Sequence, residues 1–215
     1  MYTDITGIIL SGGKSTRMGV NKSLLKVGDK TIIEYVCDLM QSIFSKVILI
    51  TNDPEEYGFL ALDIFEDVYK GYGPLAGIHS GLINSPTNKN FFISCDVPLM
   101  TKDMIKYIVD FPTNKKITIA KADGFIQQLV GTYNRDINVS IEETFKSQLR
   151  GDERDNNQHK RGCRVLSLID KVGAEIINAE SLPFYKPGTY FNMNKQDDFN
   201  FVKEKLNQLL ASKKV

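Results

Sequence analysis

Two adjacent glycines and two cations follow an apolar run close to the start of the chain. Residues 7–27 read GIILSGGKSTRMGVNKSLLKV. Gly12 and Gly13 allow backbone N–H groups to approach a phosphate group without interference from a Cβ atom. Arg17 and Lys22 supply the fixed positive charge that a triphosphate requires and that an adenosine ring does not. The segment therefore predicts a cradle for a nucleoside triphosphate.

The spacing of the glycines differs from two common nucleotide-binding motifs. A P-loop requires G-x-x-x-x-G-K followed by Ser or Thr, whereas Gly19 is followed by Val20 and the lysine comes only at Lys22. A dinucleotide-binding motif reads G-x-G-x-x-G, which GGKSTRMG does not match. The sequence therefore argues against a P-loop enzyme and a dehydrogenase. The remaining alternative is a glycine-rich turn whose charges face solvent.

A single carboxylate follows another apolar run. Asp96 comes directly after NFFISC and precedes Val97 and Pro98, so its side chain is expected at the carboxyl edge of a sheet, facing the cradle. Mg²⁺ keeps several water ligands and takes others from substrate phosphates, so one protein carboxylate is a normal way to hold it. We expect Asp96 to be the metal ligand. The alternative is an aspartate that caps the following turn.

Short apolar runs alternate with segments of helical periodicity in the first half of the chain. The runs are rich in β-branched or aromatic residues on both faces, as in central parallel strands, and occupy residues 5–10, 46–51, 90–95 and 116–121. Apolar residues three and four apart predict helices over 31–44 and 101–111, and another helix is expected over 75–84. This alternation predicts an α/β fold with a Rossmann-like, doubly wound, mostly parallel sheet flanked by helices.

The second half of the chain is less regular. Strands are expected at 125–133 and 173–179, and helices at 136–149 and 195–211. The polar, charged segment 149–162 is expected to be a mobile surface loop. We find no internal repeat and no domain boundary, and therefore expect one domain over residues 1–215.

Composition limits the partners and the compartment. The chain has 27 Lys and Arg against 26 Asp and Glu, which does not favour a nucleic acid or a membrane surface as partner. Cys37, Cys95 and Cys163 lie far apart and are expected to be reduced thiols. The sequence shows no signal peptide and no apolar run of membrane-spanning length, so we expect a cytoplasmic protein.

Four stretches carry a resemblance to a known family. LSGGKSTRMGVNKSLL (10–25) resembles the signature of the nucleotidyltransferase superfamily, which activates sugars and cofactors with nucleoside triphosphates. EDVYKGYGPLAGIHSGL (66–82), ISCDVPLMT (93–101) and FNMNKQDDF (191–199) are similar to elements of the molybdenum cofactor guanylyltransferases. The matches keep the family's order along nearly the whole chain. The resemblance implies a single-domain fold of the nucleotide-diphospho-sugar transferase type.

The resemblance also implies an activity and its partners. GMP would pass from GTP to the terminal phosphate of molybdopterin or the molybdenum cofactor, with release of pyrophosphate and with Mg²⁺ as cofactor. Residues 1–111, approximately, would bind the nucleotide, and residues 112–215 would contribute the acceptor site. Transient contact with cofactor-delivering or molybdoenzyme maturation proteins is a further implied partnership.

The candidate site residues follow from the cradle, the carboxylate and the resemblance together. The expected catalytic residues are Arg17, Lys22 and Asp96, of which Asp96 is the metal ligand. The expected nucleotide-binding residues are Leu10, Ser11, Gly12, Gly13, Lys22, Asn52, Asp67, Gly73, Gly77 and Asp96. Asp67 is expected to contact the base or the ribose, whereas Asn52 could equally be a turn former. The expected acceptor-binding residues are Gln127, Asn192 and Asn194.

The chain departs from the family pattern in the expected acceptor site. The family's Q-P-L reads Gln127-Gln128-Leu129 here, and Lys195 and Gln196 follow Asn194 where the family has Thr and Pro. Acceptor recognition is therefore less well defined by the motifs than nucleotide recognition.

The chemistry expected is direct transfer, since an acceptor phosphate is already an anion and needs no protein nucleophile or base. No catalytic triad or carboxylate pair is recognisable, and we expect His79 and His159 to be surface or local residues and Cys95 a small buried hydrophobe.

Two alternatives to the guanylyltransferase remain open. The first is another nucleotidyltransferase of the superfamily, with a CDP- or UDP-linked product and a usual G-x-G-x-R-M motif. Here three residues, Lys14 to Thr16, separate Gly13 from Arg17 instead. The second is a nucleotide-binding regulatory module, against which the presence of both Lys22 and Asp96 argues, because binding alone does not need a metal site. The base preference and the molybdenum content of the acceptor stay open.

Overall fold

The computed structural model describes residues 1–12, 21–150 and 164–212. Gly13, Arg17 and the greater part of the 149–162 segment lie outside these residues, so the structure does not test what was predicted for them. One sheet has the strand order β5-β4-β1-β6-β8-β7-β9. Its strands are β1 (Tyr2–Leu10), β4 (Phe44–Ile50), β5 (Asp63–Phe65), β6 (Lys89–Ser94), β7 (Ile117–Ala122), β8 (Phe125–Asn134) and β9 (Glu175–Asn178). A separate hairpin pairs β2 (Lys26–Val27) with β3 (Lys30–Thr31).

The sheet is mostly parallel, as predicted. The pairs β5–β4, β4–β1, β1–β6 and β7–β9 are parallel, whereas β8 runs antiparallel to both β6 and β7. The 116–121 run was expected to pair as a central parallel strand, but β7 turns directly into β8 through Asp123 and Gly124. Both residues have positive φ angles, 52° and 80°, which suit the two-residue turns that join antiparallel strands.

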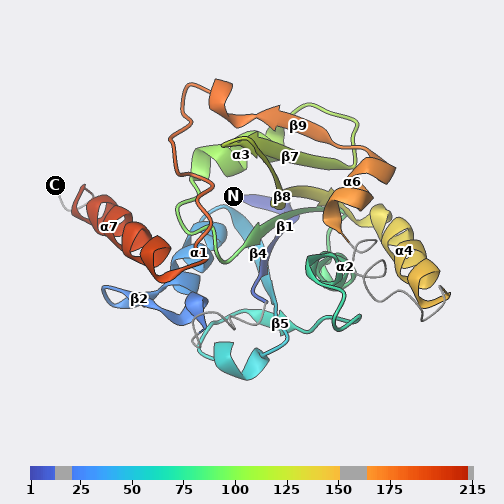
Figure 1. The fold of residues 1–215 in the computed structure, drawn as a ribbon, viewed down its shortest axis with the longest axis horizontal. Coiled ribbons are helices and arrows are strands. Elements are labelled where there is room, and N and C mark those ends of the chain that lie inside the picture. Colours follow the sequence, from blue (N-terminus) through green and yellow to red (C-terminus); the bar gives the residue numbers. More distant parts are fainter. Residues whose placement is uncertain (13–20, 151–163, 213–215) are drawn as a thin grey trace.

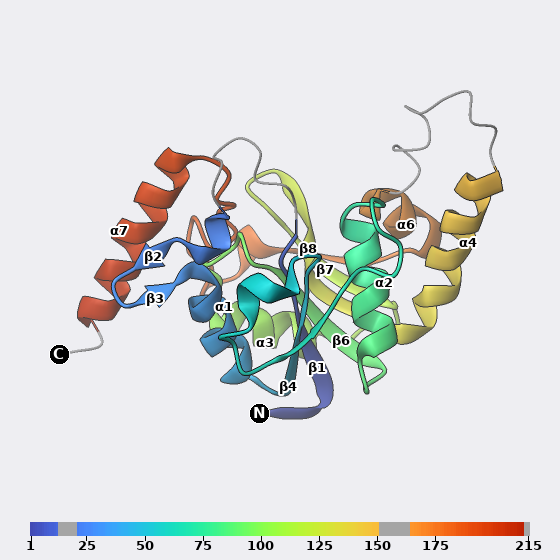
Figure 2. The same ribbon diagram turned by 90° about the horizontal axis from the view of Figure 1, so that it is seen from below.

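Helices cover both faces of this sheet. Helices α1 (Ile32–Gln41) and α3 (Lys102–Asp110) pack on one face, and α2 (Pro74–Asn84), α4 (Asn138–Arg150) and α6 (Val165–Val172) pack on the other (Figures 1 and 2). Each central strand alternates its apolar side chains between the two layers: Ile9 packs with α1 and α3, whereas Ile8 packs with α2. The predicted doubly wound arrangement is confirmed.

The C-terminal helix forms a smaller apolar cluster at one side of the sheet. Helix α7 (Gln196–Ser212) packs Phe199 and Val202 against Val27 of the β2–β3 hairpin and Ile32 of α1. Its first turn lies near the sheet and its last turn points away from it (Figure 1).

Within the described residues, no helix combines the length and apolar character that a membrane crossing requires. Strands from both halves of the chain share one sheet, and the division into a nucleotide part and an acceptor part stays a prediction.

One predicted helix ends earlier than its apolar spacing suggests. Helix α1 begins with a capping box, in which Thr31 N donates to Glu34 Oε2 at 2.6 Å and Glu34 N donates to Thr31 Oγ1 at 3.4 Å. The helix stops at Gln41, although the periodicity continues to Phe44. The reason is that Phe44 is the first residue of β4, and its buried ring packs against Tyr2 of β1 and Phe91 of β6.

Four neighbouring parallel strands end together and define the candidate site. The register aligns Leu10 of β1 with Ile50 of β4 on one side and with Ser94 of β6 on the other. Ile50 in turn lies beside Phe65 of β5. The residues that follow these strand ends must therefore emerge along one edge of the sheet, where α/β proteins bind their ligands.

Helix α2 carries a buried histidine, contrary to the surface or local position expected for it. His79 is 1% exposed and lies between the rings of Tyr69 and Phe145, with ring centroids 5.0 and 5.7 Å away. Neither ring nitrogen has a hydrogen-bond partner among the described residues, and Glu142 Oε1 is 3.6 Å from Nε2. Burial lowers the pKa of His79, although Glu142 opposes this effect. His79 is therefore a neutral residue of the hydrophobic core, on the helix that follows the 66–73 loop.

This burial makes the stability dependent on pH in a defined direction. The pKa of His79 is lower in the folded state, so the unfolded state takes up the proton first as the pH falls below about 6.5. The wild-type protein should therefore lose unfolding free energy as the pH falls from about 6.5 toward the pKa of His79 in the folded state. We expect this loss to be smaller in His79→Leu. Urea unfolding of both proteins at several pH values measures the effect. Parallel curves of unfolding free energy against pH would contradict it.

Candidate functional site

Asp96 lies at the end of β6 with one carboxylate oxygen buried. Its Oδ1 has no hydrogen-bond partner among the described residues. The next helix is capped by Thr101, whose hydroxyl accepts from Met104 N at 3.3 Å, and not by Asp96. Burial raises the pKa of Asp96, while Ser94, Asn192 and Lys22 oppose the rise. A buried carboxylate oxygen without a donor is costly unless a cation lies beside it.

The environment of Asp96 suits a divalent cation that takes most of its ligands from elsewhere. Within the described part of the chain, no group of three or more His, Cys, Asp or Glu side chains could enclose a metal ion. A hard cation bound at Asp96 would therefore complete its coordination with phosphate oxygens and water, as Mg²⁺ commonly does. The donor set thus fits a metal ion that arrives with a nucleotide.

Lys22 is placed beside the segment that contacts Asp96. Asn21 caps the short helix η1 (Lys22–Leu24) by accepting from Ser23 N at 3.1 Å. Lys22 Nζ donates to the carbonyl oxygen of Met193 at 3.5 Å, and Met193 N donates to the carbonyl oxygen of Asp96 at 2.9 Å. The lysine and the aspartate, 74 positions apart in the sequence, thus meet around one short stretch of backbone.

Asn192 lies on that same stretch. It was predicted to bind the acceptor, and it lies next to the Asp96 carboxyl group, where it opposes the rise that burial causes in the pKa of Asp96. Its side chain is exposed. Asn192 therefore lies close to Asp96, and its role toward the acceptor stays a prediction.

A second pair of site residues lies along the edge at β4 and β5. Asn52 Nδ2 donates to Asp67 Oδ2 at 2.7 Å, and Asp67 N donates to Asn52 Oδ1 at 3.3 Å. These reciprocal bonds give Asn52 a role across two strand ends, beyond that of a local turn former. Burial raises the pKa of Asp67, and the hydrogen bond from Asn52 and the charge of Lys70 oppose the rise.

The glycines around helix α2 have different local roles. Gly73 precedes the helix with a φ of 66°, which favours glycine, and Pro74 begins the helix. At Gly77, a Cβ atom would lie 3.2 Å from Leu10 Cδ2 and 3.7 Å from Asp67 Oδ1. Gly77 therefore lets α2 pack closely on the end of β1 and on Asp67. At Gly12, by contrast, a Cβ atom would meet no atom of the described residues within 4 Å.

Leu10 and Ser11 form the framework of the edge. Leu10 is buried and its carbonyl oxygen accepts from Cys95 N at 3.0 Å. Ser11 is 3% exposed, its N–H donates to Ile50 O at 2.9 Å, and its hydroxyl lies 2.7 Å from the Tyr57 hydroxyl. Tyr57 was not among the predicted site residues, because nothing in the sequence around it signals a contact with Ser11.

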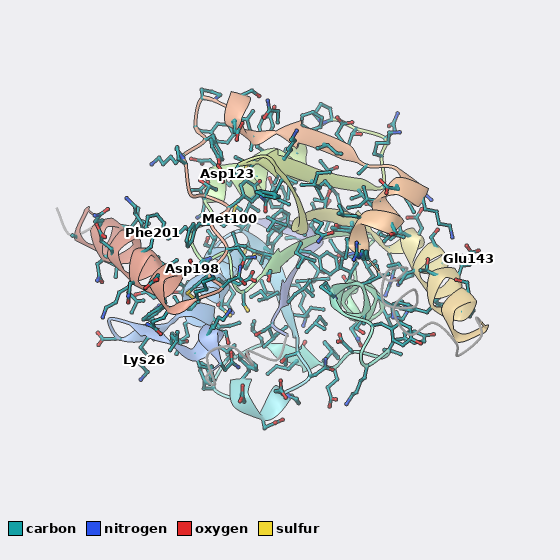
Figure 3. All side chains as sticks on the ribbon, viewed as in Figure 1. Lys26, Met100, Asp123, Glu143, Asp198 and Phe201 are labelled. Carbon is teal, nitrogen blue, oxygen red and sulfur yellow. The ribbon has the colours of Figure 1, made fainter. Side chains whose placement is uncertain are left out.

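The remaining candidates lie where β8 and α7 begin. Gln127 Nε2 donates to Ala122 O at 3.2 Å, across the β7–β8 hairpin that adjoins β6. The neighbouring Gln128 has a buried Oε1 without a partner among the described residues. Backbone N–H groups of Asn194 and Lys195 both donate to Asp198 Oδ2 at 2.6 Å, at the inner end of α7 (Figure 3).

Comparisons with known proteins cover nearly the whole chain. A family model described as MobA-like NTP transferase domain matches residues 7–159. A curated protein of Carboxydothermus hydrogenoformans, named "Probable molybdenum cofactor guanylyltransferase", is 30% identical over 212 residues, which are 98% of each protein. A crystal structure of an Aquifex aeolicus protein is 27% identical, with a TM-score of 0.71, and the match covers 90% of this chain and 95% of that one.

A more distant structure supports the fold alone. Molybdopterin-guanine dinucleotide biosynthesis protein A from Archaeoglobus fulgidus is 18% identical and has a TM-score of 0.76. That match covers 94% of this chain and 99% of the other. The similarity therefore includes the C-terminal elements as well as the four-strand edge.

Proposed function

Because the chain belongs to the MobA-like NTP transferase family, we propose that it transfers GMP from GTP to the terminal phosphate of molybdopterin or its molybdenum-loaded form. This proposal rests on two observations at the edge where four parallel strands end: Lys22 Nζ and the backbone of Asp96 both bond to Met193, and one carboxylate oxygen of Asp96 lacks a partner among the described residues. A lysine and a carboxylate on either side of one backbone segment suit a triphosphate that binds together with a metal ion. The contact with cofactor-delivering or maturation proteins stays a prediction.

The transfer itself needs little from the protein beyond position and charge. An oxygen of the acceptor phosphate forms a bond to the α-phosphorus of GTP, and the bond between that phosphorus and the bridging oxygen breaks. Pyrophosphate leaves with the electron pair. Lys22 would offset the charge that grows on the α- and β-phosphates. Arg17 is proposed to do the same, on the basis of the sequence motif.

The side chains near the site are consistent with direct transfer. Burial raises the pKa of the Cys95 thiol to about 12, so the residue beside Asp96 is a protonated thiol at neutral pH and a poor nucleophile. His79 is buried in the core with α2 and α4. Neither residue is needed, because the acceptor phosphate already carries the attacking charge.

Asp96 is proposed to hold Mg²⁺ together with the triphosphate. The bound ion would supply charge neutralisation and orientation of the phosphate groups. Asn52 and Asp67 are proposed to bind the base or the ribose at the other end of the edge, since a carboxylate accepts hydrogen bonds from a base N–H or a ribose hydroxyl. Gln127, Asn192 and Asn194 remain the proposed acceptor residues.

Nucleotide preference tests this proposal against the other members of the superfamily. We expect GTP with Mg²⁺ to raise the melting temperature more than ATP, CTP or UTP does. A ligand at 100 times its dissociation constant adds about 2.7 kcal/mol of stability, which a thermal shift detects. Each nucleotide is compared with Mg²⁺ alone and with the nucleotide plus chelator. A larger shift with CTP would favour a cytidylyltransferase.

A further inference from the structure

The connection between β4 and β5 contains a buried tyrosine that the proposed reaction does not explain. Tyr57 ends the short helix η2 (Pro54–Tyr57), shortly after Asn52. It is 2% exposed, and its ring belongs to the apolar cluster beneath α1 and α3. A tyrosine hydroxyl in such a position needs hydrogen-bond partners, because an unpaired buried hydroxyl is destabilising.

The Tyr57 hydroxyl has three partners in the part of the chain that the structure describes. Its oxygen lies 2.7 Å from Ser11 Oγ, 2.8 Å from Asn21 Nδ2 and 2.8 Å from Ser23 Oγ. Asn21 Nδ2 can only donate, and Ser23 Oγ donates to Asn21 Oδ1 at 2.8 Å. Ser23 Oγ must therefore accept the Tyr57 proton, and the Ser11 hydroxyl must donate to Tyr57. The one donor and two acceptor positions of the phenol are all used.

These bonds tie together two separate parts of the site. Ser11 directly follows β1 at the centre of the sheet edge, whereas Asn21 and Ser23 flank Lys22 and hold the turn of η1 around it. Lys22 then extends to the carbonyl oxygen of Met193, next to Asp96. The hydroxyl of Tyr57 thus fixes the backbone from which Lys22 reaches toward Asp96.

We propose that Tyr57 is a positioning residue that acts through Lys22, holding its ammonium at the sheet edge where the triphosphate binds. This inference rests on the proposed function, since it concerns the same site. Replacing Tyr57 by phenylalanine keeps the ring in the core but leaves the polar groups of Ser11, Asn21 and Ser23 without this shared partner. The turn around Lys22 then loses its link through Tyr57 to Ser11, although Asn21 Nδ2 still donates to Glu56 Oε2 of η2.

A double-mutant cycle separates positioning from general stability. We expect Tyr57→Phe to lower kcat about tenfold in the wild-type background, on the scale of coupling between residues of one network. In the Lys22→Ala background the same change should lower kcat less than about twofold, because the group being positioned is gone. Equal factors in both backgrounds would overturn the inference, since a structural loss acts independently of Lys22.

A binding cycle keeps the test independent of the transfer reaction. The dissociation constant of inorganic triphosphate is measured by titration calorimetry for the same four proteins. Positioning is supported if Tyr57→Phe weakens triphosphate binding in the wild-type background but has no effect on it in the Lys22→Ala background. This result would hold even if the wild type transferred no GMP and the proposed function failed. Equal weakening in both backgrounds overturns the positioning role by itself.

Two further variants control the cycle. Tyr2→Phe removes one tyrosine hydroxyl bond, to Asp110 Oδ2 at 2.7 Å, at the opposite end of β1, and should leave kcat and triphosphate binding unchanged. If Tyr57→Phe does not fold, Ser23→Ala is carried through the same cycle: it removes the Ser23 bonds to Tyr57 and to Asn21 Oδ1 but keeps the bonds of Ser11 and Asn21 to the Tyr57 hydroxyl. A loss in Tyr2→Phe equal to that in Tyr57→Phe would overturn the inference.

Discussion

Asp96→Asn is expected to abolish nearly all nucleotidyl transfer, lowering kcat by about 10³-fold or more, while the protein stays folded. The substitution preserves the shape of the side chain and one neutral oxygen, but it removes the charge that would hold a hard cation. Weak nucleotide binding that does not depend on metal should remain, through Lys22 and the backbone donors of the glycine-rich segment. Binding and transfer are thereby separated in one variant.

The same substitution should stabilise the protein in the absence of metal. In the wild type, the Asp96 carboxylate buries an oxygen that has no partner among the described residues. An amide in its place carries no charge, so we expect the free energy of unfolding to rise by an amount on the order of 1 kcal/mol. A site that loses activity while the fold gains stability is typical of a residue retained for function.

Pyrophosphate release across a Mg²⁺ titration and urea unfolding with chelator measure the two effects. Asp63→Asn is the matched control, because Asp63 lies at the start of β5 in an exposed ion pair with Lys46, and such pairs contribute little. Its transfer activity should equal that of the wild type. Unchanged activity and Mg²⁺ dependence in Asp96→Asn would refute the role given to this carboxylate.

Lys22→Ala is expected to lower kcat by about 10²- to 10³-fold, the scale of one lost preorganised electrostatic contact. The ammonium group would act where charge grows on the α- and β-phosphates, so kcat should carry more of the loss than KM. Folding should be nearly unaffected, because the described bond from Lys22 to Met193 O is a long one at 3.5 Å.

Lys26→Ala is the control for this second prediction. Lys26 lies on the same stretch of sequence, but its side chain is exposed on the β2–β3 hairpin, away from the sheet (Figure 3). Steady-state kinetics with GTP and acceptor should show no change in kcat for this variant. If Lys22→Ala and Lys26→Ala behaved alike and both kept full activity, Lys22 would be only a surface charge.

The part of the site that could be predicted is the part that follows directly from strands. Asp96 comes immediately after an apolar run, and Ser11 after another, so their place at the carboxyl edge follows once the sheet is recognised. The reciprocal bonds between Asn52 and Asp67 required the order of β4 and β5, which the runs alone do not give. Parallel register then explains why these residues meet.

Tertiary contacts account for what could not be predicted. Tyr57 joins Ser11 and Asn21 across 46 and 36 positions of sequence, and no local pattern encodes such a contact. The end of α1 was misjudged because Phe44 continues the helical spacing but contributes its ring to β4. The antiparallel pairing of β7 and β8 was not predicted, although the Asp123-Gly124 turn is a local signal for it. Helix α6 was not predicted either, and its only signal in the sequence is the helical spacing of Val165, Leu168 and Ile169.

Transfer of isotope from GTP shows whether this protein moves a guanylyl group to the acceptor. The wild-type protein is incubated with Mg²⁺, molybdopterin and GTP labelled at the α-phosphorus, in parallel with GTP labelled at the γ-phosphorus. We expect the α-label to enter a guanine dinucleotide of the acceptor, the γ-label to appear in pyrophosphate, and both products to require the acceptor. Label appearing only in GMP or GDP, or GTP left unconsumed beside an acceptor that accepts CMP from CTP, would contradict guanylyl transfer by this protein.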